Sequence, residues 1–411
     1  MPISNSFSVP AAAALILILS TCSLIPIEAA EKDDDSVPCT KRGANCSYCT
    51  LGKWTTLQGL WSTRCEWCAK SLKCYAPNDS GNPCGDDVSI TTVAACPSEH
   101  RVQYDSKRGK KALFLAGSAY EEGGCLESCA KGFEGGCYQL LKQVKFPCAS
   151  VLHSGYECFA YVAVSDAERH VVVSYRGTSE AAQLFSEGES CVLKAHVEAP
   201  SGGKVFEYFY AGVNQSYSRI ATEIRPFVLQ SYTLWTVGHS LGGAFATVFM
   251  SFVAQEVWIN KNDTHLITLG SPRVGNWDFA RRLEFHFPNI YRIVHHRDMV
   301  VNVPPQMNLW GPHLKTLTSY ALLPSELHSS MTLDKPFHAG IVIYYDNNME
   351  NAEEYKICAQ EDAKECSVFL HTSVQDHLMY FHSQVSKVCN CTNIPPRESK
   401  SVAINHAQEE L

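Results

Sequence analysis

The 411-residue sequence has no excess of positive charge, no membrane-length apolar run and no internal repeat. Lys and Arg number 34 against 42 Asp and Glu, a net charge of −8, so a nucleic-acid partner is not expected. The apolar run at residues 11–19 falls short of the ~20 residues that a membrane span needs. With 45% hydrophobic residues the chain can bury a large core, and its length favours two structural units over one.

The N-terminal residues are typical of a secretory signal peptide. The apolar run weakens through Leu24 and Ile27 and ends at the charged residues 31–35. Cleavage near Ala29 would remove residues 1–29 together with Cys22, which leaves 18 cysteines, an even number. No Lys or Arg precedes the run, so an uncleaved anchor remains the alternative. We expect a secreted, extracellular protein or one of the secretory-pathway lumen.

Two further features bear on the secretory pathway. Five sequons for N-glycosylation agree with secretion, at Asn45, Asn78, Asn214, Asn262 and Asn390. The last four residues, 408–411, faintly resemble a retention signal of the Lys-Asp-Glu-Leu kind. A solvated acidic tail explains them equally well.

Nineteen cysteines indicate an oxidising compartment, and eight of them lie close together. These eight are Cys39, Cys46, Cys49, Cys65, Cys68, Cys74, Cys84 and Cys96. Two CxxC pairs occur among them, but not at the intervals of zinc fingers, so disulfides are favoured over a metal site. A segment this short cannot bury a sufficient core and must be cross-linked. The ten cysteines from Cys125 to Cys391 are also interpreted as structural, with Cys358 and Cys366 as a local pair.

The spacing of the eight cysteines, with Glu66-Trp67 inside residues 65–68, resembles the PSI (plexin, semaphorin, integrin) cysteine-rich domain. The resemblance implies a small module at residues 39–97. Such modules mostly space or orient their neighbours, and a protein contact through the module is the alternative role.

After the cysteine-rich segment, short strands alternate with helix-length segments. The β-branched and aromatic runs that predict strands lie at residues 161–164, 170–175, 233–237, 265–269, 290–294 and 341–345. Helices are predicted from residue 111 to 120 and from residue 241 to 256. The alternation predicts an α/β fold whose mainly parallel sheet carries helices on both faces. This second domain would span residues 100–395, followed by a polar tail at residues 396–411.

The strongest local signal is Gly238-His239-Ser240-Leu241-Gly242, a G-x-S-x-G motif between a predicted strand and a predicted helix. Glycines are needed there because the turn is too tight for side chains, and the serine hydroxyl is left exposed. The helix N-terminus directs free N–H groups at an oxygen beside the serine, where acyl transfer develops negative charge. The pattern therefore predicts Ser240 as a nucleophile.

The partners of such a serine follow it in the order acid, then histidine. Asp298 comes directly after the strand at residues 290–294 and is favoured over Asp263 and Asp278. His377 is favoured as the base because a catalytic histidine lies in a loop after the last strand. The remaining candidates for the base are His338, His371 and His382.

Five motifs in order resemble those of the class 3 lipases, an α/β-hydrolase family of triacylglycerol lipases. They lie at residues 174–178, 238–244, 270–276, 298–305 and 376–381. The resemblance implies a doubly wound α/β-hydrolase fold over about residues 100–391, a Ser240, Asp298 and His377 triad, and no cofactor or metal. It also implies an oxyanion hole from Thr178 and the backbone N–H of Leu241. The family usually places a lid helix after the motif that ends at residue 178. The sequence of residues 179–188 does not decide whether a lid helix is present here.

The predicted activity is hydrolysis of acylglycerol esters at a lipid–water interface. A phospholipase A1-like enzyme or an esterase for soluble esters is the near alternative, because spacing does not reveal the shape of the acyl pocket. A non-catalytic extracellular binding protein on a hydrolase scaffold is the alternative from a different class. The complete set of Ser240, Asp298 and His377 argues against it.

Overall fold

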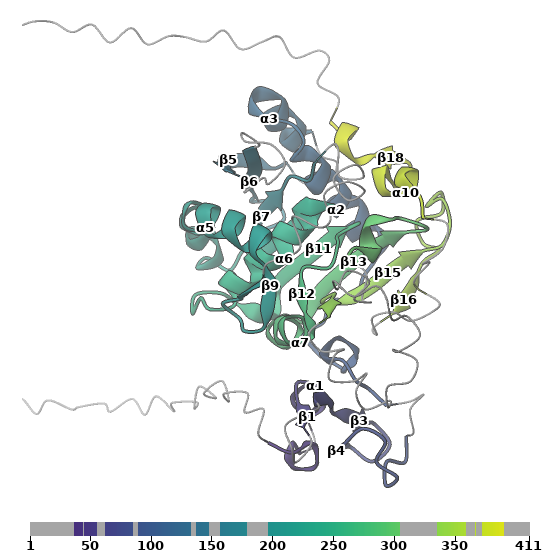
Figure 1. Ribbon diagram of the computed structural model, residues 1–411. Helices are drawn as coiled ribbons and strands as arrows, with labels where there is room; N and C mark the ends of the chain where they lie inside the picture. Colours follow the sequence, from purple (N-terminus) through teal and green to yellow (C-terminus); the bar gives the residue numbers. More distant parts are fainter. Residues whose placement is uncertain are drawn as a thin grey trace, which may run out of the picture. The chain divides into compact units, whose positions relative to one another are not determined.

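An eight-stranded sheet forms the centre of the protein in a computed structural model (Figure 1). The structure describes residues 37–43, 45–55, 62–84, 89–132, 137–147, 157–178, 196–304, 335–358, 366 and 372–389. The described residues belong to one compact unit, and the predicted signal peptide lies outside them.

The strand order of the central sheet is β16-β15-β13-β11-β10-β7-β6-β5. The strands are β5 (Gln139–Pro147), β6 (Glu157–Ser165), β7 (His170–Tyr175), β10 (Thr233–His239), β11 (Thr264–Leu269), β13 (Asn289–His295), β15 (Ile341–Tyr345) and β16 (Lys356–Cys358). The five strands from β7 to β15 run parallel, and β5, β6 and β16 join antiparallel at the edges. The predicted, mainly parallel sheet is confirmed.

Helices cover both faces of the sheet, as the sequence predicts (Figure 1). On one face, α5 (Glu207–Val228), α6 (Leu241–Val253) and α7 (Trp277–His286) contribute to one apolar core. On the other face, α2 (Ser106–Ser118) and α3 (Gly123–Lys131) contribute to the second core. Successive side chains of a strand point to opposite faces, so Val162 joins the first core and Tyr161 the second.

Helix α2 begins a turn earlier than the apolar pattern predicts. The Asp105 side chain accepts a hydrogen bond from the backbone N–H of Arg108 at 2.8 Å, so it caps the helix at residue 106. Helix α6 begins at the predicted Leu241 and ends at Val253, three residues before the predicted end.

A second sheet has four antiparallel strands in the order β14-β12-β9-β8. Along the chain, these strands alternate with those of the main sheet. Its strands are β8 (His196–Glu198), β9 (Lys204–Phe206), β12 (Gly275–Asn276) and β14 (Pro336–Phe337). A short helix, α10 (Val374–Leu378), and the hairpin of β17 (Met379–Tyr380) and β18 (Ser383–Gln384) follow the main sheet.

The cysteine-rich segment is cross-linked by disulfides, as predicted. The pairs are Cys39–Cys65, Cys46–Cys96, Cys49–Cys74 and Cys68–Cys84. Its elements are α1 (Cys46–Thr50) and the hairpins of β1 (Lys53–Thr55) with β2 (Ser62–Arg64) and β3 (Glu66–Cys68) with β4 (Lys73–Tyr75). No group of residues able to hold a metal ion occurs in the described part of the chain.

Most of the later cysteines that the structure describes are in disulfides as well. Cys358–Cys366 is the predicted local pair, and Cys129–Cys389 ties α3 to the C-terminal segment. Cys137 departs from the prediction, because it is exposed and free among the described residues.

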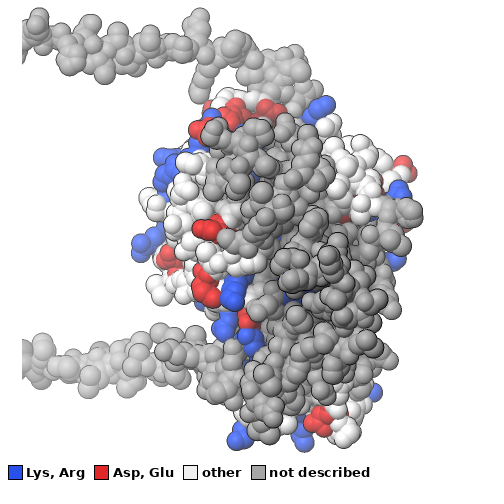
Figure 2. All heavy atoms as spheres, viewed as in Figure 1, with Lys and Arg blue, Asp and Glu red and all other residues white. Residues whose placement is uncertain are grey.

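The surface of the described residues carries mixed charge. Acidic and basic side chains are interspersed on the described part of the face seen in Figure 2. Four of the five sequon asparagines, Asn45, Asn78, Asn214 and Asn262, are exposed, and Asn390 lies outside the described residues. Among the described helices, none has the length and apolar character to cross a membrane.

Candidate active site

Ser240 lies in a sharp turn between β10 and α6, with a positive φ of 59° and ψ of −131°. This backbone conformation is strained for a residue with a side chain. A Cβ atom on Gly238 would lie 2.3 Å from the carbonyl carbon of Gly242, and a Cβ on Gly242 would lie 2.1 Å from the carbonyl oxygen of Tyr175. The two glycines are therefore required by close backbone contacts, as the G-x-S-x-G pattern predicts.

Asp298 and His377, 79 residues apart in the sequence, are in direct contact. The Nδ1 atom of His377 lies 2.9 Å from Oδ1 and 3.0 Å from Oδ2 of Asp298. Asp298 follows the end of β13, and His377 lies in α10, whose Ser373 side chain caps the helix through the N–H of Asp376. Both side chains are fully buried. The structure thus brings the predicted acid and base together.

Further hydrogen bonds hold the Asp298 carboxylate. The Tyr380 hydroxyl donates to Oδ2 at 2.7 Å, and the N–H of Val300 donates to Oδ1 at 2.8 Å. Burial alone would raise the pKa of Asp298, but the nearby His377 and the hydrogen bonds to the carboxylate outweigh it and hold the pKa below its usual value. The carboxylate is therefore ionised at neutral pH, and Nδ1 of His377 carries the hydrogen that faces it.

Ten buried polar side-chain atoms have no hydrogen-bond partner within the described residues, and three of them belong to predicted site residues: Oγ of Ser240, Nε2 of His377 and Oγ1 of Thr178. Buried polar atoms are usually paired, so such exceptions require an explanation. With the hydrogen of His377 on Nδ1, Nε2 presents a lone pair. Leu241 is the first residue of α6, and the first N–H groups of a helix have no acceptor within it.

The other candidate residues have different surroundings. Asp278 forms ion pairs with Lys53 and Arg281, and Asp263 accepts a hydrogen bond from the Thr233 hydroxyl at 3.1 Å. His338 is buried with Nε2 2.8 Å from the carbonyl oxygen of Val301. His382 lies in the turn between β17 and β18. His371 and residues 179–188, where the family usually places a lid helix, lie outside the described residues.

Four residues of the site were not singled out from the sequence. Tyr380, Gly270 and His239 lie within the motifs quoted from the sequence, and His295 lies three residues before Asp298. Gly270 has φ of +57°, and a Cβ atom there would lie 2.5 Å from Oδ2 of Asp298 and 2.9 Å from Nδ1 of His377. A positive φ and a contact made only in the folded chain leave no signal in a single sequence.

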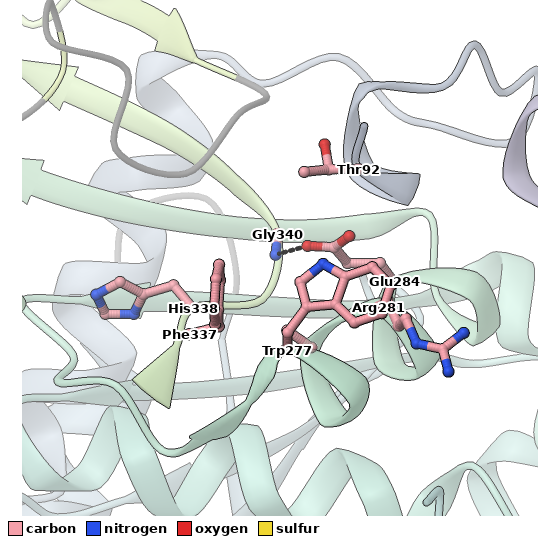
Figure 3. Close-up of a pocket in the computed structure, with 8 residues that line it drawn as sticks. Thr92, Trp277, Arg281, Glu284, Phe337, His338 and Gly340 are labelled. Atoms are coloured by element: carbon pink, nitrogen blue, oxygen red, sulfur yellow. Dashed lines mark hydrogen bonds between the residues drawn. The ribbon is translucent and has the colours of Figure 1, made fainter. Parts of the chain in front are cut away.

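A small cavity lies between α7 and the end of the cysteine-rich segment (Figure 3). Glu284 lines it, and its carboxylate accepts the N–H of Gly340 at 2.7 Å and the N–H of Ala94 at 3.0 Å. Burial raises the pKa of Glu284 to about 7, although those hydrogen bonds and the charges of Arg292 and Arg101 lower it. Ser240, Asp298 and His377 are not among the residues that line this cavity.

Comparison with known proteins gives consistent matches to lipases. The family model described as "Lipase (class 3)" matches residues 172–308, which include Thr178, Ser240, Leu241 and Asp298. The chain is 28% identical over 246 residues to lipase ZK262.3 of Caenorhabditis elegans, covering 56% of this chain and 67% of that protein. It is 29% identical over 232 residues to a lipase of Rhizopus niveus, covering 54% of this chain and 50%, about half, of that protein.

The fold agrees with these matches. The solved structure of a triacylglyceride lipase from Rhizomucor miehei superposes with a TM-score of 0.54 and 22% identity over 70% of this chain and 98% of that one. At that identity the superposition shows the fold, which is the α/β-hydrolase fold predicted from the sequence. The family model and the sequence relatives thus support the resemblance of this chain to the class 3 lipases.

Proposed function

We propose that this protein is a serine hydrolase that cleaves carboxylic esters of acylglycerols. The observation that carries the proposal is the contact of Nδ1 of His377 with the ionised Asp298, which leaves Nε2 as a base, in a chain whose Ser240 occupies a strained turn. His377 would take the proton of the Ser240 hydroxyl as its oxygen attacks the ester carbonyl. Asp298 would hold the imidazole tautomer and stabilise the imidazolium that forms.

The tetrahedral intermediate needs hydrogen-bond donors for its oxyanion. The N–H of Leu241 at the start of α6 and the backbone N–H and hydroxyl of Thr178 are the proposed donors. When the intermediate collapses, His377 gives its proton to the leaving alcohol, and an acyl group stays on Ser240. Water then attacks the acyl-enzyme with His377 again as base, which releases the fatty acid and restores the serine. Loss of one oxyanion donor lowers turnover by roughly 10²–10³.

The proposed substrate is a long-chain acylglycerol at a lipid–water interface. Support comes from the sequence similarity to two proteins named as lipases and from the fold shared with a triacylglyceride lipase. The side chains of Ser240 and His377 are fully buried, so an ester has to reach a site that is closed to solvent. A phospholipid or a soluble ester is the alternative substrate class.

The proposed location is the extracellular space or the secretory-pathway lumen. The support is the set of disulfides in both halves of the chain, because such bonds persist in oxidising compartments. The exposed sequon asparagines at positions 45, 78, 214 and 262 are compatible with glycosylation there. Glycosidase treatment followed by mass measurement tests this glycosylation.

We also propose that the chain has two modules, at residues 39–97 and 100–395.

The test of the substrate is fatty-acid release from a long-chain triacylglycerol as its concentration rises from dissolved monomer into emulsion. Ser240→Ala is the blank. We expect release that increases on emulsification. Saturation before emulsification would indicate an esterase for soluble esters, and release from phospholipid alone would indicate a phospholipase. A folded protein that releases nothing above the blank from any of these would overturn the proposal in favour of a non-catalytic binding protein.

A further inference from the structure

The turn that carries His377 is bound through its backbone by a second histidine. Nδ1 of His295 lies 2.9 Å from the carbonyl oxygen of Asp376 and 2.6 Å from that of Met379. Carbonyl oxygens only accept hydrogen bonds, so Nδ1 of His295 carries the hydrogen and donates to both. One buried imidazole therefore bridges the residues on either side of His377.

A third histidine binds the carbonyl of His377 itself. Nε2 of His239 lies 2.8 Å from that oxygen, and Nδ1 of His239 lies 2.8 Å from the hydroxyl of Tyr120. Burial first, and then the neighbouring His377, lower the pKa of His239 to about 3, so the ring is neutral at physiological pH. A neutral ring satisfies both contacts when Nε2 donates to the carbonyl and Nδ1 accepts from the Tyr120 hydroxyl. The rings of His239 and His377 also stack, with centroids 4.6 Å apart.

Both donors belong to the central sheet, whereas the turn that they bind contains only the short helix α10. His239 is the last residue of β10, and His295 is the last residue of β13. Helix α10 has five residues, and a helix that short is not stable without tertiary contacts. The described part of this turn is also held by the N–H of Ser373, which donates to the carbonyl of Arg297 at 2.7 Å, and by the N–H of Arg297, which donates to the Asp376 carboxylate at 3.1 Å. The orientation of His377 therefore depends on contacts from the ends of these two strands.

We propose that His295 and His239 are positioning residues, which fix the orientation of the His377 imidazole by donating hydrogen bonds to the carbonyls of the α10 turn. The inference rests on the proposed function of His377 as the base. Neither imidazole exchanges a proton with substrate. Since a misplacement of about 1 Å costs about 100-fold in rate, removal of either donor lowers kcat by about 10- to 100-fold and leaves KM unchanged.

The experiment compares two substitutions of His295 in the full chain. His295→Phe keeps a planar ring but removes the donor, and His295→Asn places an amide N–H near the position of Nδ1. The measurements are kcat and KM on a water-soluble p-nitrophenyl ester and the melting temperature of each variant. We expect His295→Phe to lose kcat with KM unchanged and His295→Asn to recover most of the loss. His239→Phe and His239→Gln form a second pair of the same design, in which the Gln amide N–H replaces that of Nε2. This pair tests the proposal if His295→Phe does not fold.

The matched control is His265→Phe. His265 is equally buried and lies in β11, but near its start, with its ring stacked on Trp235. This variant is expected to lose stability and keep kcat. The proposal is overturned if the Phe variants fold and keep kcat, if the Asn and Gln variants recover nothing, or if His265→Phe loses as much kcat. Failure of the proposed function looks different, because wild type would then be no more active than Ser240→Ala.

Discussion

Substitution of Gly270 by alanine should displace the base and acid of the site. The added Cβ atom would lie 2.5 Å from Oδ2 of Asp298, 2.9 Å from Nδ1 of His377 and 3.0 Å from the Tyr380 hydroxyl, while ordinary contacts begin at 3.4 Å. Relief of the shortest contact requires a shift of about 1 Å, and a misplacement of that size costs about 100-fold in rate. We therefore expect kcat of Gly270→Ala to fall by about 100-fold.

The control for this prediction is Gly123→Ala. Gly123 has φ of +61°, close to the +57° of Gly270, but nothing lies within 4 Å of a Cβ atom there. Both variants carry about 1–2 kcal/mol of strain from the left-handed backbone conformation, so both should melt a few degrees lower than wild type. The assay is hydrolysis of a soluble ester together with thermal unfolding. If Gly270→Ala kept a kcat within a few fold of that of Gly123→Ala, the argument from the collision would be refuted.

Three further predictions concern buried groups. Tyr380→Phe removes a hydrogen bond to the charged Asp298 carboxylate and should lower the free energy of unfolding at neutral pH by about 2 kcal/mol in denaturant titrations; no loss would contradict it. His377→Ala should abolish ester turnover, while His338→Ala, whose Nε2 lies 2.8 Å from the carbonyl oxygen of Val301, keeps most of it; kinetics on folded variants decide, and the reverse result would reassign the base. The pKa of Glu284 in the folded protein, about 7, lies above its unfolded value. Its contribution to the free energy of unfolding is therefore fully present below the unfolded pKa and is lost as pH rises through about 7, a loss of about 3 kcal/mol. Melting curves from pH 4 to 8 should therefore show a slope in wild type that is absent from Glu284→Gln.

Much of the fold follows from the sequence because its strands are continuous apolar runs. The runs at residues 170–175 and 341–345 coincide with β7 and β15 to the residue, since a strand buried on both faces is mostly apolar along its length. Strand β5 was not predicted, because the alternating polar residues between 139 and 147 belong to a half-exposed edge strand. Helix α5 was also not predicted, although its buried residues recur at helical spacing.

The site could be predicted where the chemistry requires particular residues at a fixed spacing. The tight turn at Ser240 needs glycines two residues before and after it, which leaves a pattern in any single sequence. The pairing of Asp298 with His377 was predicted from the order of elements along the chain. The contacts of Tyr380, His239 and His295 are long-range and join ordinary residue types, so only the folded chain brings them together.

Covalent labelling with a fluorophosphonate tests whether Ser240 is an activated nucleophile. The reagent forms a bond with a serine oxygen only when a nearby base removes the proton, so it requires Ser240 and His377 together. We predict one label per chain, mapped to Ser240 by peptide mass spectrometry, absent in Ser240→Ala and strongly slowed in His377→Ala. Folded wild-type protein that takes up no label, or that takes it up equally in Ser240→Ala, would contradict the proposed mechanism.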